Sequence, residues 1–472
     1  MAFRSGTLSL QTDDQKKDLN HSSECDQIVQ QRDSCSYTYA PIDKFGVIGR
    51  WFRHKLLDGI LVGTPVLLTI QKHRTSNRTI LMKTLSFLGT EDFYTALFLC
   101  LMWLFDPRLG RLFGLLMWVG FYITGFLKTL LCLPRPPCPP VVPLEKAFDW
   151  ALPSHHSLLG VIMPWYIWLY ATLHYELSTI EMSIVCTLIV LWSFGVLLSR
   201  LYLGVHSPAD IVCGGIVGVL VLSMWMQIDD LVDFYISQQR LEPQLKLIGC
   251  TFLLLFIHPI TEPGNPSFID TCVLYGVGCG IILSRSQRSR YLGMPALLET
   301  QPDLLLISFL KLSFYRMVLG VLIITVLRIC LKQVFLTLVQ QTYRLIGLPC
   351  FNSSLYRKSM PPNPKHYTKE FKIPPIYLNT KIDDDKSDSS QSCSSSQGEE
   401  SLSEVSKDEI SKDDFDSRKW FSFMQIFSTV HSLTSKSAEP WDVTIPVKLV
   451  VYCIITYVGL EFVPQLFTML NI

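Results

Sequence analysis

The sequence predicts an all-α protein, a polytopic membrane helical bundle. The chain of 472 residues is 49% hydrophobic and only 17% charged, whereas about a quarter of the residues in a typical soluble protein are charged. Long apolar runs recur from about residue 55 to about residue 340, and a last one covers 445–470. Because backbone exposed to lipid must satisfy its own hydrogen bonds, we expect these runs to be helices.

The apolar runs, taken in chain order, are the predicted membrane helices. A helix that crosses a bilayer needs ~20 mostly apolar residues, so several runs are expected to extend into their flanks. The clearest runs cover residues 93–106, 113–133, 157–174, 182–198, 211–228, 248–262, 268–284, 313–337 and 445–470. The stretch 56–71 is a weaker candidate, because Asp58 and Pro65 interrupt it.

Two polar regions interrupt this pattern. Residues 1–50 are polar and mixed in charge, and we expect a loosely ordered tail there. Residues 345–440 contain a segment rich in Ser, Asp and Glu, which cannot bury enough apolar surface to offset its ordering entropy and should be disordered. Ser396 and Ser401 each precede Glu by three residues and are candidates for phosphorylation, although a solvated linker is the simpler interpretation.

Charge and cysteine content exclude several classes of protein. With 41 basic and 40 acidic residues the formal net charge is +1, which does not suggest a nucleic-acid partner. The 14 cysteines include no CxxC pair and no zinc-ligand spacing, so we expect them to be apolar filler and expect no metal site. The N-terminus lacks the pattern of a cleaved signal peptide, so internal segments are expected to direct membrane insertion.

The first of three polar motifs closes the run 113–133. Lys128 lies near the end of that run, and Arg135 follows between Pro134 and Pro136. Taken alone, Lys128 fits a lysine that extends its ammonium from the bilayer to the interface. The two prolines stiffen the backbone around Arg135, and a guanidinium held in this way can bind two phosphate oxygens.

The second motif, Pro153-Ser154-His155-His156, immediately precedes the run 157–174. Serine at a helix start is usually an N-cap, which is the simpler interpretation of Ser154. The unpaired N–H groups of a first helical turn also form an anion site. We expect His156 to project at this site as a proton donor, and His155 to contribute mainly backbone.

The third motif joins Arg200, at the end of one apolar run, to His206, Ser207, Pro208 and Asp210 at the start of the next. Ser, Pro and Asp in this order indicate the N-cap and first turn of a helix. Asp210 can then reach back toward His206 and fix its tautomer, which leaves the other ring nitrogen as a nucleophile. The alternative is a capping Asp beside an incidental His. Arg200 adds another cation.

All three motifs are expected on one face of the membrane. The first ends one apolar run and the second begins the next, while the third follows after one further span and its return. Three unrelated capping sequences need not share a face. Fixed cations, two imidazoles and an acid partner together suit the cleavage of a phosphate ester without a metal ion.

The spacing Lys-x6-Arg-Pro, Pro-Ser-x-His and Ser-Arg-x5-His-x3-Asp resembles the signature of the type 2 phosphatidic acid phosphatase superfamily. Within it, segments 132–136 and 200–210 resemble the sphingoid-base-phosphate phosphatases, particularly the fungal ones. The resemblance covers residues 55–285 well and the rest weakly. His155 is a departure, because the superfamily often has Gly at that position.

The resemblance implies a metal-independent reaction through a phosphohistidine, with no cofactor. His206 would attack phosphorus, Asp210 would orient it and stabilise its positive charge, and His156 would protonate the leaving alkoxide. Four residues would hold the phosphoryl oxygens: Lys128, Arg135, Ser154 and Arg200. Water would then hydrolyse the intermediate.

The resemblance also implies a six-helix phosphatase core within residues 51–235, with 56–71 as its first helix. Residues 236–344 would add further transmembrane helices, and a C-terminal transmembrane helix at 441–472 would follow the disordered loop at 345–440. Family members of this kind reside in the endoplasmic reticulum membrane with the site facing the lumen. A laterally open site of this kind suits a substrate whose tail stays in the bilayer.

Charged residues give opposing signals on orientation. Arg108 and Arg111 lie on the face opposite the motifs, as expected for the cytosolic side. Four basic residues would instead be lumenal: Lys72, Arg74, Arg78 and Lys83. Glycosylation sequons begin at Asn77, on the motif side, and at Asn352 in the later loop. If each later run spans once, the Ser-rich loop is lumenal and beyond the reach of a cytosolic kinase.

We expect the protein to dephosphorylate long-chain sphingoid base 1-phosphates. A rival interpretation keeps the chemistry and changes the lipid to phosphatidate, lysophosphatidate or an isoprenyl diphosphate, with lipid transphosphatidylation as a smaller variant. Glu145 or Asp149 could meet a substrate ammonium, although solvated loop acids are the simpler interpretation. A non-catalytic lipid-phosphate binder or a transporter is less favoured, because nucleophile, orienting acid and proton donor are all present.

Overall fold

The computed structural model describes residues 40–138, 140–145, 147, 149–238, 241–259, 266–284, 306–347 and 443–470. All regular structure in these ranges is helical, which confirms the predicted all-α fold class. The expected tail at 1–39 lies outside the described residues. So does the segment 348–442, which holds Ser396, Ser401 and the sequon at Asn352.

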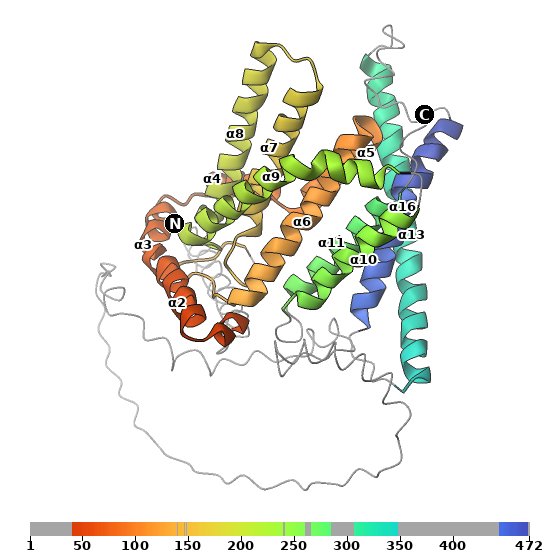
Figure 1. The fold of residues 1–472 in the computed structure, drawn as a ribbon. Helices are drawn as coiled ribbons and strands as arrows, with labels where there is room; N and C mark the ends of the chain where they lie inside the picture. Colours follow the sequence, from red (N-terminus) through yellow and green to blue (C-terminus); the bar gives the residue numbers. More distant parts are fainter. Residues whose placement is uncertain are drawn as a thin grey trace, which may run out of the picture.

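Figure 1 shows the described helices in their chain order. They are η1 (Pro41–Phe45), α2 (Gly46–Val62), α3 (Thr64–Lys72), α4 (Ser76–Phe87), α5 (Glu91–Leu104), α6 (Pro107–Leu131), α7 (His155–His174), α8 (Thr179–Tyr202), α9 (Pro208–Ile236), α10 (Leu241–Ile257), α11 (Pro266–Leu283), α13 (Leu306–Leu345) and α16 (Thr444–Met469). The predicted apolar runs therefore all correspond to helices, whose ends differ by several residues from the runs.

Five of these helices are long and apolar enough to cross a membrane: α6, α8, α9, α13 and α16. Helices α4 and α5 form a sixth candidate if the 50° bend between them lies within a single span. The chain is a multi-pass membrane protein. α7 has 20 residues and forms where the run 157–174 predicts it, but it is not one of the five.

Two expectations for the N-terminal part are wrong. Residues 41–50, expected in a loose tail, are helical. The stretch 56–71 is not one helix, because α2 ends and α3 begins on either side of Gly63. A Cβ at Gly63 would lie 2.6 Å from Cδ of Pro208. The turn between α2 and α3 therefore packs directly against the start of α9, and only a glycine leaves room for that contact.

The centre of the molecule is built from α5, α6, α7 and α9. α7 lies against α6, α8 and α9, and α5 packs on α6. The apolar interior between these helices buries large aromatic side chains almost completely, among them Tyr94, Phe113, Trp118, Tyr166 and Trp225. Interdigitated side chains of this size leave the helices little freedom to shift, so the helix ends are held in fixed relative positions.

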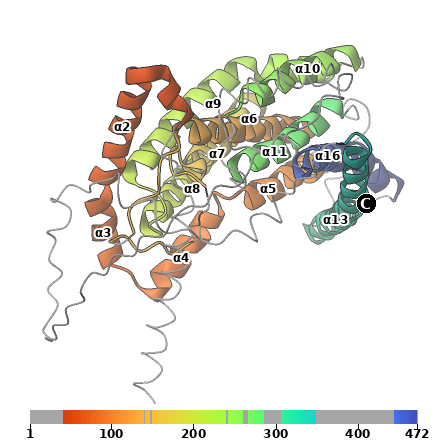
Figure 2. The ribbon, with the colours of Figure 1, turned by 90° about the horizontal axis from the view of Figure 1, so that it is seen from below.

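The C-terminal helices attach to one side of this core. α11 packs against α6 and α16, and α13 packs against α16 and α5. Trp103 of α5 donates from Nε1 to the carbonyl of Gly459 on α16 (2.9 Å), and Arg316 of α13 donates to the carbonyl of Trp103 (3.3 Å). Figure 2 shows these helices on the opposite side of the molecule from α2 and α3.

A polar network closes the end of the bundle where α6 begins. Arg108 and Arg111 of α6 both bind the carboxylate of Asp233 on α9, at 3.0 and 2.7 Å. Tyr170 of α7 donates to Asp106, the N-cap of α6, at 2.9 Å. This end lies opposite the last turn of α6, where Lys128 is found, in agreement with the expected separation of Arg108 and Arg111 from the motifs.

Candidate active site

The three polar motifs meet at one end of the bundle, as predicted. They supply side chains from the ends of four helices: Lys128 of α6, Ser154 before α7, Arg200 of α8 and Asp210 of α9. The backbone N–H of Ala151 donates to the carbonyl of Leu133 (2.9 Å), and that of Ser154 donates to the carbonyl of Asp210 (3.2 Å). These two bonds join the first motif to the second and the second to the third.

Local hydrogen bonds orient the helix starts at the site. The side chain of Ser154 caps α7 and accepts from the N–H of Ser157. Ser207 caps α9 reciprocally, because its Oγ accepts from the N–H of Asp210 (3.2 Å) while Asp210 Oδ2 accepts from the N–H of Ser207 (2.7 Å). Both predicted N-caps are confirmed. The capping box holds the Asp210 carboxylate in one position beside His206.

The ring of His206 lies between an acid and a guanidinium. Its Nδ1 is 3.5 Å from Oδ2 of Asp210, and its Nε2 is 2.9 Å from Nη1 of Arg135, which is also 3.4 Å from Nδ1. A guanidinium has only donors, so the closer nitrogen, Nε2, carries the lone pair and the ring proton is on Nδ1, toward Asp210. This is the tautomer that leaves Nε2 free to act as a nucleophile.

The environment of His206 keeps its imidazole uncharged. Burial lowers the pKa of His206 most, and the positive charges of Arg135, Arg200 and Lys128 lower it further, well below 6.5. At neutral pH the ring is therefore unprotonated at Nε2, as nucleophilic attack requires.

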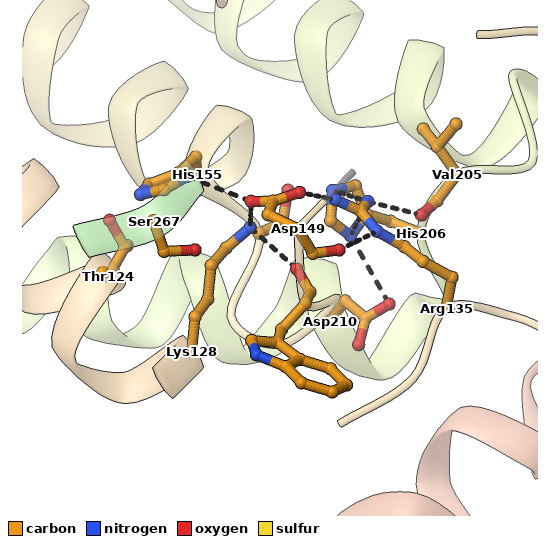
Figure 3. A network of polar contacts seen from close by, with 12 residues as sticks. Thr124, Lys128, Arg135, Asp149, His155, Val205, His206, Asp210 and Ser267 are labelled. Carbon is orange, nitrogen blue, oxygen red and sulfur yellow. Dashed lines mark hydrogen bonds and ion pairs between the residues drawn. The ribbon is translucent and has the colours of Figure 1, made fainter. Parts of the chain in front are cut away.

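Arg135 connects the first motif to the third. Its Nη1 donates to the carbonyl of Val205 (2.8 Å), and its Nε donates to the carbonyl of Asp149 (3.1 Å). Figure 3 shows the guanidinium lying between the ring of His206 and the carboxylate of Asp149. The side chain is thus fixed by two backbone carbonyls, as its position between two prolines suggested.

Asp149 bridges the two cations of the first motif. Its Oδ2 accepts from Nζ of Lys128 and its Oδ1 accepts from Nη2 of Arg135 (Figure 3). Lys128 also donates to the carbonyl of Trp150 (2.9 Å). Burial alone would raise the pKa of Asp149, but the charges of Lys128, Arg135 and His155 outweigh it and hold that pKa far below its usual range. The carboxylate is therefore ionised.

The interpretation of Lys128 as a lysine that extends its ammonium to the membrane interface is wrong. Its side chain is only 1% exposed, because its ammonium points into the site. Asp149 is likewise not a solvated loop acid, and Glu145, although its side chain is 37% exposed, is held in an ion pair. Glu145 binds Nη1 of Arg200 at 2.6 Å, and Arg200 also donates to Oγ of Ser86 (2.7 Å). Each cation of the site is thus paired with a carboxylate from the loop between α6 and α7.

Several buried nitrogen atoms at the site have no hydrogen-bond partner among the described residues. They are Nε of Arg200, Nε2 of His155 and Nε2 of His156. Buried polar atoms are rarely left unpaired without a functional reason. Unpaired groups of this kind, together with three cations, suit the binding of a phosphate ester.

The side chain of His155 belongs to the network, so the expectation that it contributes mainly backbone is wrong. Its Nδ1 is 3.8 Å from Oδ2 of Asp149, and its ring packs at 5.0 Å from the ring of Phe121. His156 lies under the turn between α4 and α5, where a Cβ at Gly89 would be 3.2 Å from its Cδ2. Both imidazoles are therefore fixed by packing.

Sequence reasoning missed that Glu145 and Asp149 pair with the cations of the site, and it missed one polar clamp. Glu145 and Asp149 are the only acidic residues from 107 to 175. Since buried cations need counter-charges, this isolation in a loop between cationic motifs was a usable signal. Gln71 of α3 holds the same loop, donating to the carbonyl of Val142 (2.7 Å) and accepting from its N–H (3.1 Å). No sequence signal indicated that contact.

The described residues contain no group of three or more His, Cys, Asp or Glu side chains placed to hold a metal ion. The reactive arrangement in this part of the chain consists of imidazoles, carboxylates and fixed cations. Such an arrangement can attack a phosphate ester and stabilise the charge that develops on its oxygens.

Comparison with known proteins agrees with this chemistry. Residues 109–232 match the PAP2 superfamily, and this range contains all the site residues described above except Ser86 and Gln71. The chain is 31% identical over 316 residues to "Lipid phosphate phosphatase delta" of Arabidopsis thaliana, covering 63% of this chain and 72% of the plant protein.

The names of two further relatives include a sphingoid base phosphate. "Sphingosine-1-phosphate phosphatase 1" of Rattus norvegicus is 28% identical over 281 residues, covering 58% of this chain and 63% of its own length. A "Dihydrosphingosine 1-phosphate phosphatase" of Saccharomyces cerevisiae is 29% identical over 232 residues, covering 47% of this chain and 56% of its own. The chain thus spans somewhat more than half the length of these two relatives.

Among solved structures, a transmembrane PAP2 type phosphatidylglycerolphosphate phosphatase from Bacillus subtilis matches 41% of this chain and 97% of its own, with 20% identity and a TM-score of 0.34. The family assignment rests on the sequence comparisons instead. With a plant relative matched over most of its length and the family region spanning the three motifs, this chain belongs to the PAP2 superfamily and is a phosphatase.

Proposed function

We propose that the protein dephosphorylates long-chain sphingoid base 1-phosphates, such as dihydrosphingosine 1-phosphate, in the membrane. The observation that carries the reaction type is the geometry of His206, whose Nε2 lone pair faces Arg135 while Nδ1 faces Asp210. The lipid class is supported by the rat and yeast relatives. The free base and inorganic phosphate are the products.

The proposed reaction has two steps. Nε2 of His206 attacks phosphorus, a P–N bond forms, and the P–O bond to the lipid breaks while His156 gives its proton to the leaving alkoxide. Water then attacks the phosphohistidine, His156 takes up a proton, and the P–N bond breaks. Asp210 stabilises the imidazolium character that His206 acquires, because it lies beside Nδ1.

The phosphoryl oxygens are proposed to bind the cations at the helix ends. Four groups of the site contribute to this binding: Lys128, Arg135, Ser154 and Arg200. The N–H groups of the first turn of α7 add the partial positive charge of a helix N-terminus. These groups stabilise the additional charge of the transition state without reorganising.

We also propose an endoplasmic reticulum location with the site in the lumen. Asn77 lies at the start of α4, where Thr79 Oγ1 is 3.1 Å from the hydroxyl of Tyr202 at the end of α8. The sequon is thus on the same side as the site. If that side is lumenal, treatment with an endoglycosidase should increase the mobility of Asn352→Gln, which keeps the sequon at Asn77, but not of the double variant Asn77→Gln/Asn352→Gln. A site proposed in the cytosol would predict no shift for either.

The test of the function is phosphate release by the purified full-length protein in detergent micelles containing EDTA. Substrates are dihydrosphingosine 1-phosphate and phosphatidate, each offered to wild type and to His206→Ala. We expect release from the sphingoid lipid that survives EDTA and disappears in the variant. Faster release from phosphatidate would move the function to glycerolipids, and negligible release by folded wild type from both would favour a binder or transporter.

A further inference from the structure

The carboxylate of Asp149 occupies the place where the phosphoryl group is proposed to bind. It receives hydrogen bonds from Nζ of Lys128 and Nη2 of Arg135, which are the donors assigned to the phosphoryl oxygens. Both cations are nearly completely buried. A carboxylate and a phosphoryl group therefore compete for the same two donors.

The side chain of Asp149 can leave this position without unfolding the loop. The carbonyl of Asp149 is held separately by Nε of Arg135 (3.1 Å), and the carbonyl of the next residue, Trp150, is held by Lys128 (2.9 Å). These bonds fix the backbone while the carboxylate can change rotamer. The side chain is 19% exposed, so it is not enclosed on every side.

Displacement leaves Asp149 in need of another cation. Before any substrate enters, Lys128 and Arg135 share the carboxylate of Asp149, and Arg200 pairs with Glu145. A phosphoryl group on Lys128 and Arg135 removes the partners of Asp149, and an unpaired charge in a largely buried site is strongly disfavoured. A substrate that brings its own cation next to the phosphoester relieves this imbalance.

We propose that Asp149 is a specificity-determining residue, which selects lipid phosphates with an ammonium beside the phosphoester. In the empty site it holds Lys128 and Arg135 in place; in the occupied site it binds the substrate ammonium. Sphingoid base 1-phosphates carry such an ammonium on the carbon next to the ester carbon, whereas phosphatidate carries none. This inference rests on the proposed function and assigns its headgroup selectivity to one side chain.

The test compares two substrates that differ only at that nitrogen, which is a charged ammonium in one and a neutral amide in the other. They are dihydrosphingosine 1-phosphate and its N-acetyl derivative, offered in mixed micelles to full-length wild type, Asp149→Asn and Asp230→Asn. Asp230 pairs with Arg108 at the opposite end of the bundle and is 82% exposed, so its substitution removes a charge of the same kind outside the site. The readout is the ratio of kcat/KM for the amine to that for the amide.

We expect wild type and Asp230→Asn to prefer the amine, and Asp149→Asn to lose about tenfold of that preference, as for loss of one hydrogen bond to a charged group. Asp149→Asn should also bind inorganic phosphate about tenfold more tightly, because the amide competes less well for Lys128 and Arg135. An unchanged ratio in folded Asp149→Asn would overturn the proposal, and so would weaker phosphate binding.

Inorganic phosphate binding separates this inference from the proposed function. It is measured as protection against thermal unfolding and requires no turnover. If wild type hydrolyses neither lipid, the proposed function fails, while tighter phosphate binding by Asp149→Asn still supports displacement of the carboxylate. If wild type hydrolyses the amide as fast as the amine, the function stands as a lipid phosphatase and the specificity role of Asp149 is rejected.

Discussion

His206 gains its reactivity from its neighbours. Burial and the surrounding guanidinium and ammonium groups disfavour a proton on the ring, while the capped Asp210 favours the tautomer with Nδ1 protonated. The two effects act on different nitrogens, so they do not oppose one another. The result is a neutral imidazole inside a positively charged pocket, as the proposed nucleophilic attack on an anionic substrate requires.

This environment predicts the acid limb of the pH profile. Because the pKa of His206 is lowered, the neutral ring persists below 6.5, and protonation of His206 should not lower kcat/KM until the pH drops well below that value. The measurement is kcat/KM against pH with the sphingoid substrate. In Arg135→Gln the limb should move to higher pH, because a positive charge next to the ring is lost. A wild-type limb at or above 6.5 would contradict the assignment.

Two substrates with different leaving groups can distinguish the proposed roles of His156 and His206. His156→Ala should lower kcat about 10²- to 10⁴-fold on the lipid, whose alkoxide needs a proton, and less than about tenfold on para-nitrophenyl phosphate, whose leaving group needs none. His206→Ala should lose at least about 10³-fold on both substrates. Equal losses in His156→Ala on both substrates would remove it as the proton donor.

At the scale of helices, the site depends on how closely α7 and α9 approach. Gly214 of α9 faces the start of α7, where an added Cβ would lie 2.8 Å from the carbonyl oxygen of Ser154. The next residue, Gly215, faces open space, with no atom within 4 Å of an added Cβ. The small residue at 214 therefore allows the caps of both helices to meet.

These neighbouring glycines provide a matched pair of variants. Gly214→Ala should displace Ser154 and His156 from His206 and lower kcat/KM about tenfold or more, since overpacking costs roughly 1–3 kcal/mol and small misplacements reduce catalysis strongly. Gly215→Ala should leave kcat/KM unchanged and favour the helix by about 1 kcal/mol. Phosphate release and thermal unfolding of both variants test this, and similar activities would contradict it.

Gly204 has a comparable role in the turn that leads to His206. Its φ is +66°, and a Cβ there would lie 2.6 Å from Nε2 of Gln71 and 2.8 Å from the carbonyl oxygen of Val142. A side chain at this position would be strained and would also push against the clamp on the α6–α7 loop. The helix ends and the loop that carries Asp149 are therefore positioned by one set of contacts.

At the scale of the whole molecule, the C-terminal helices are docked on the core, and Ser267 of α11 lies near Lys128 in the polar network of the site (Figure 3). α11 mediates this contact, because it packs on α6 with one side and on α16 with another. A Cβ at Gly280 of α11 would lie 2.6 Å from the carbonyl oxygen of Cys453 on α16. The helices of this region carry none of the proposed site residues, so we expect them to contribute stability.

A substitution at the contact between α11 and α16 tests whether the C-terminal helices contribute stability and not activity. Gly280→Val should separate α11 from α16 and lower the apparent unfolding temperature in detergent by roughly 2–10 °C, with kcat/KM within about threefold of wild type. Gly249→Val, on an open face of α10, is the control. A tenfold loss of kcat/KM in Gly280→Val without a loss of stability would mean that these helices shape the site.

The sequence by itself determined the helices, the two caps and the position of the motifs at helix ends. These features depend on local relations: apolar runs for the spans, and hydrogen bonds between residues three apart for Ser154 and Ser207. The number of membrane spans between the motifs then indicated that all three lie on one face of the membrane. The contact between His206 and Asp210 was also predictable, because the two residues are four apart.

Only the tertiary structure decided which charges pair. Asp149 binds partners 14 and 21 residues away, and Glu145 binds one 55 residues away. Such pairs depend on how helix ends pack, which no local pattern encodes. The same reason explains why Lys128 points inward, why the side chain of His155 joins the network, and why α2 breaks from α3 where it meets α9. The cations and the two loop acids were visible in the sequence, but the ion pairs between them became visible only in the fold.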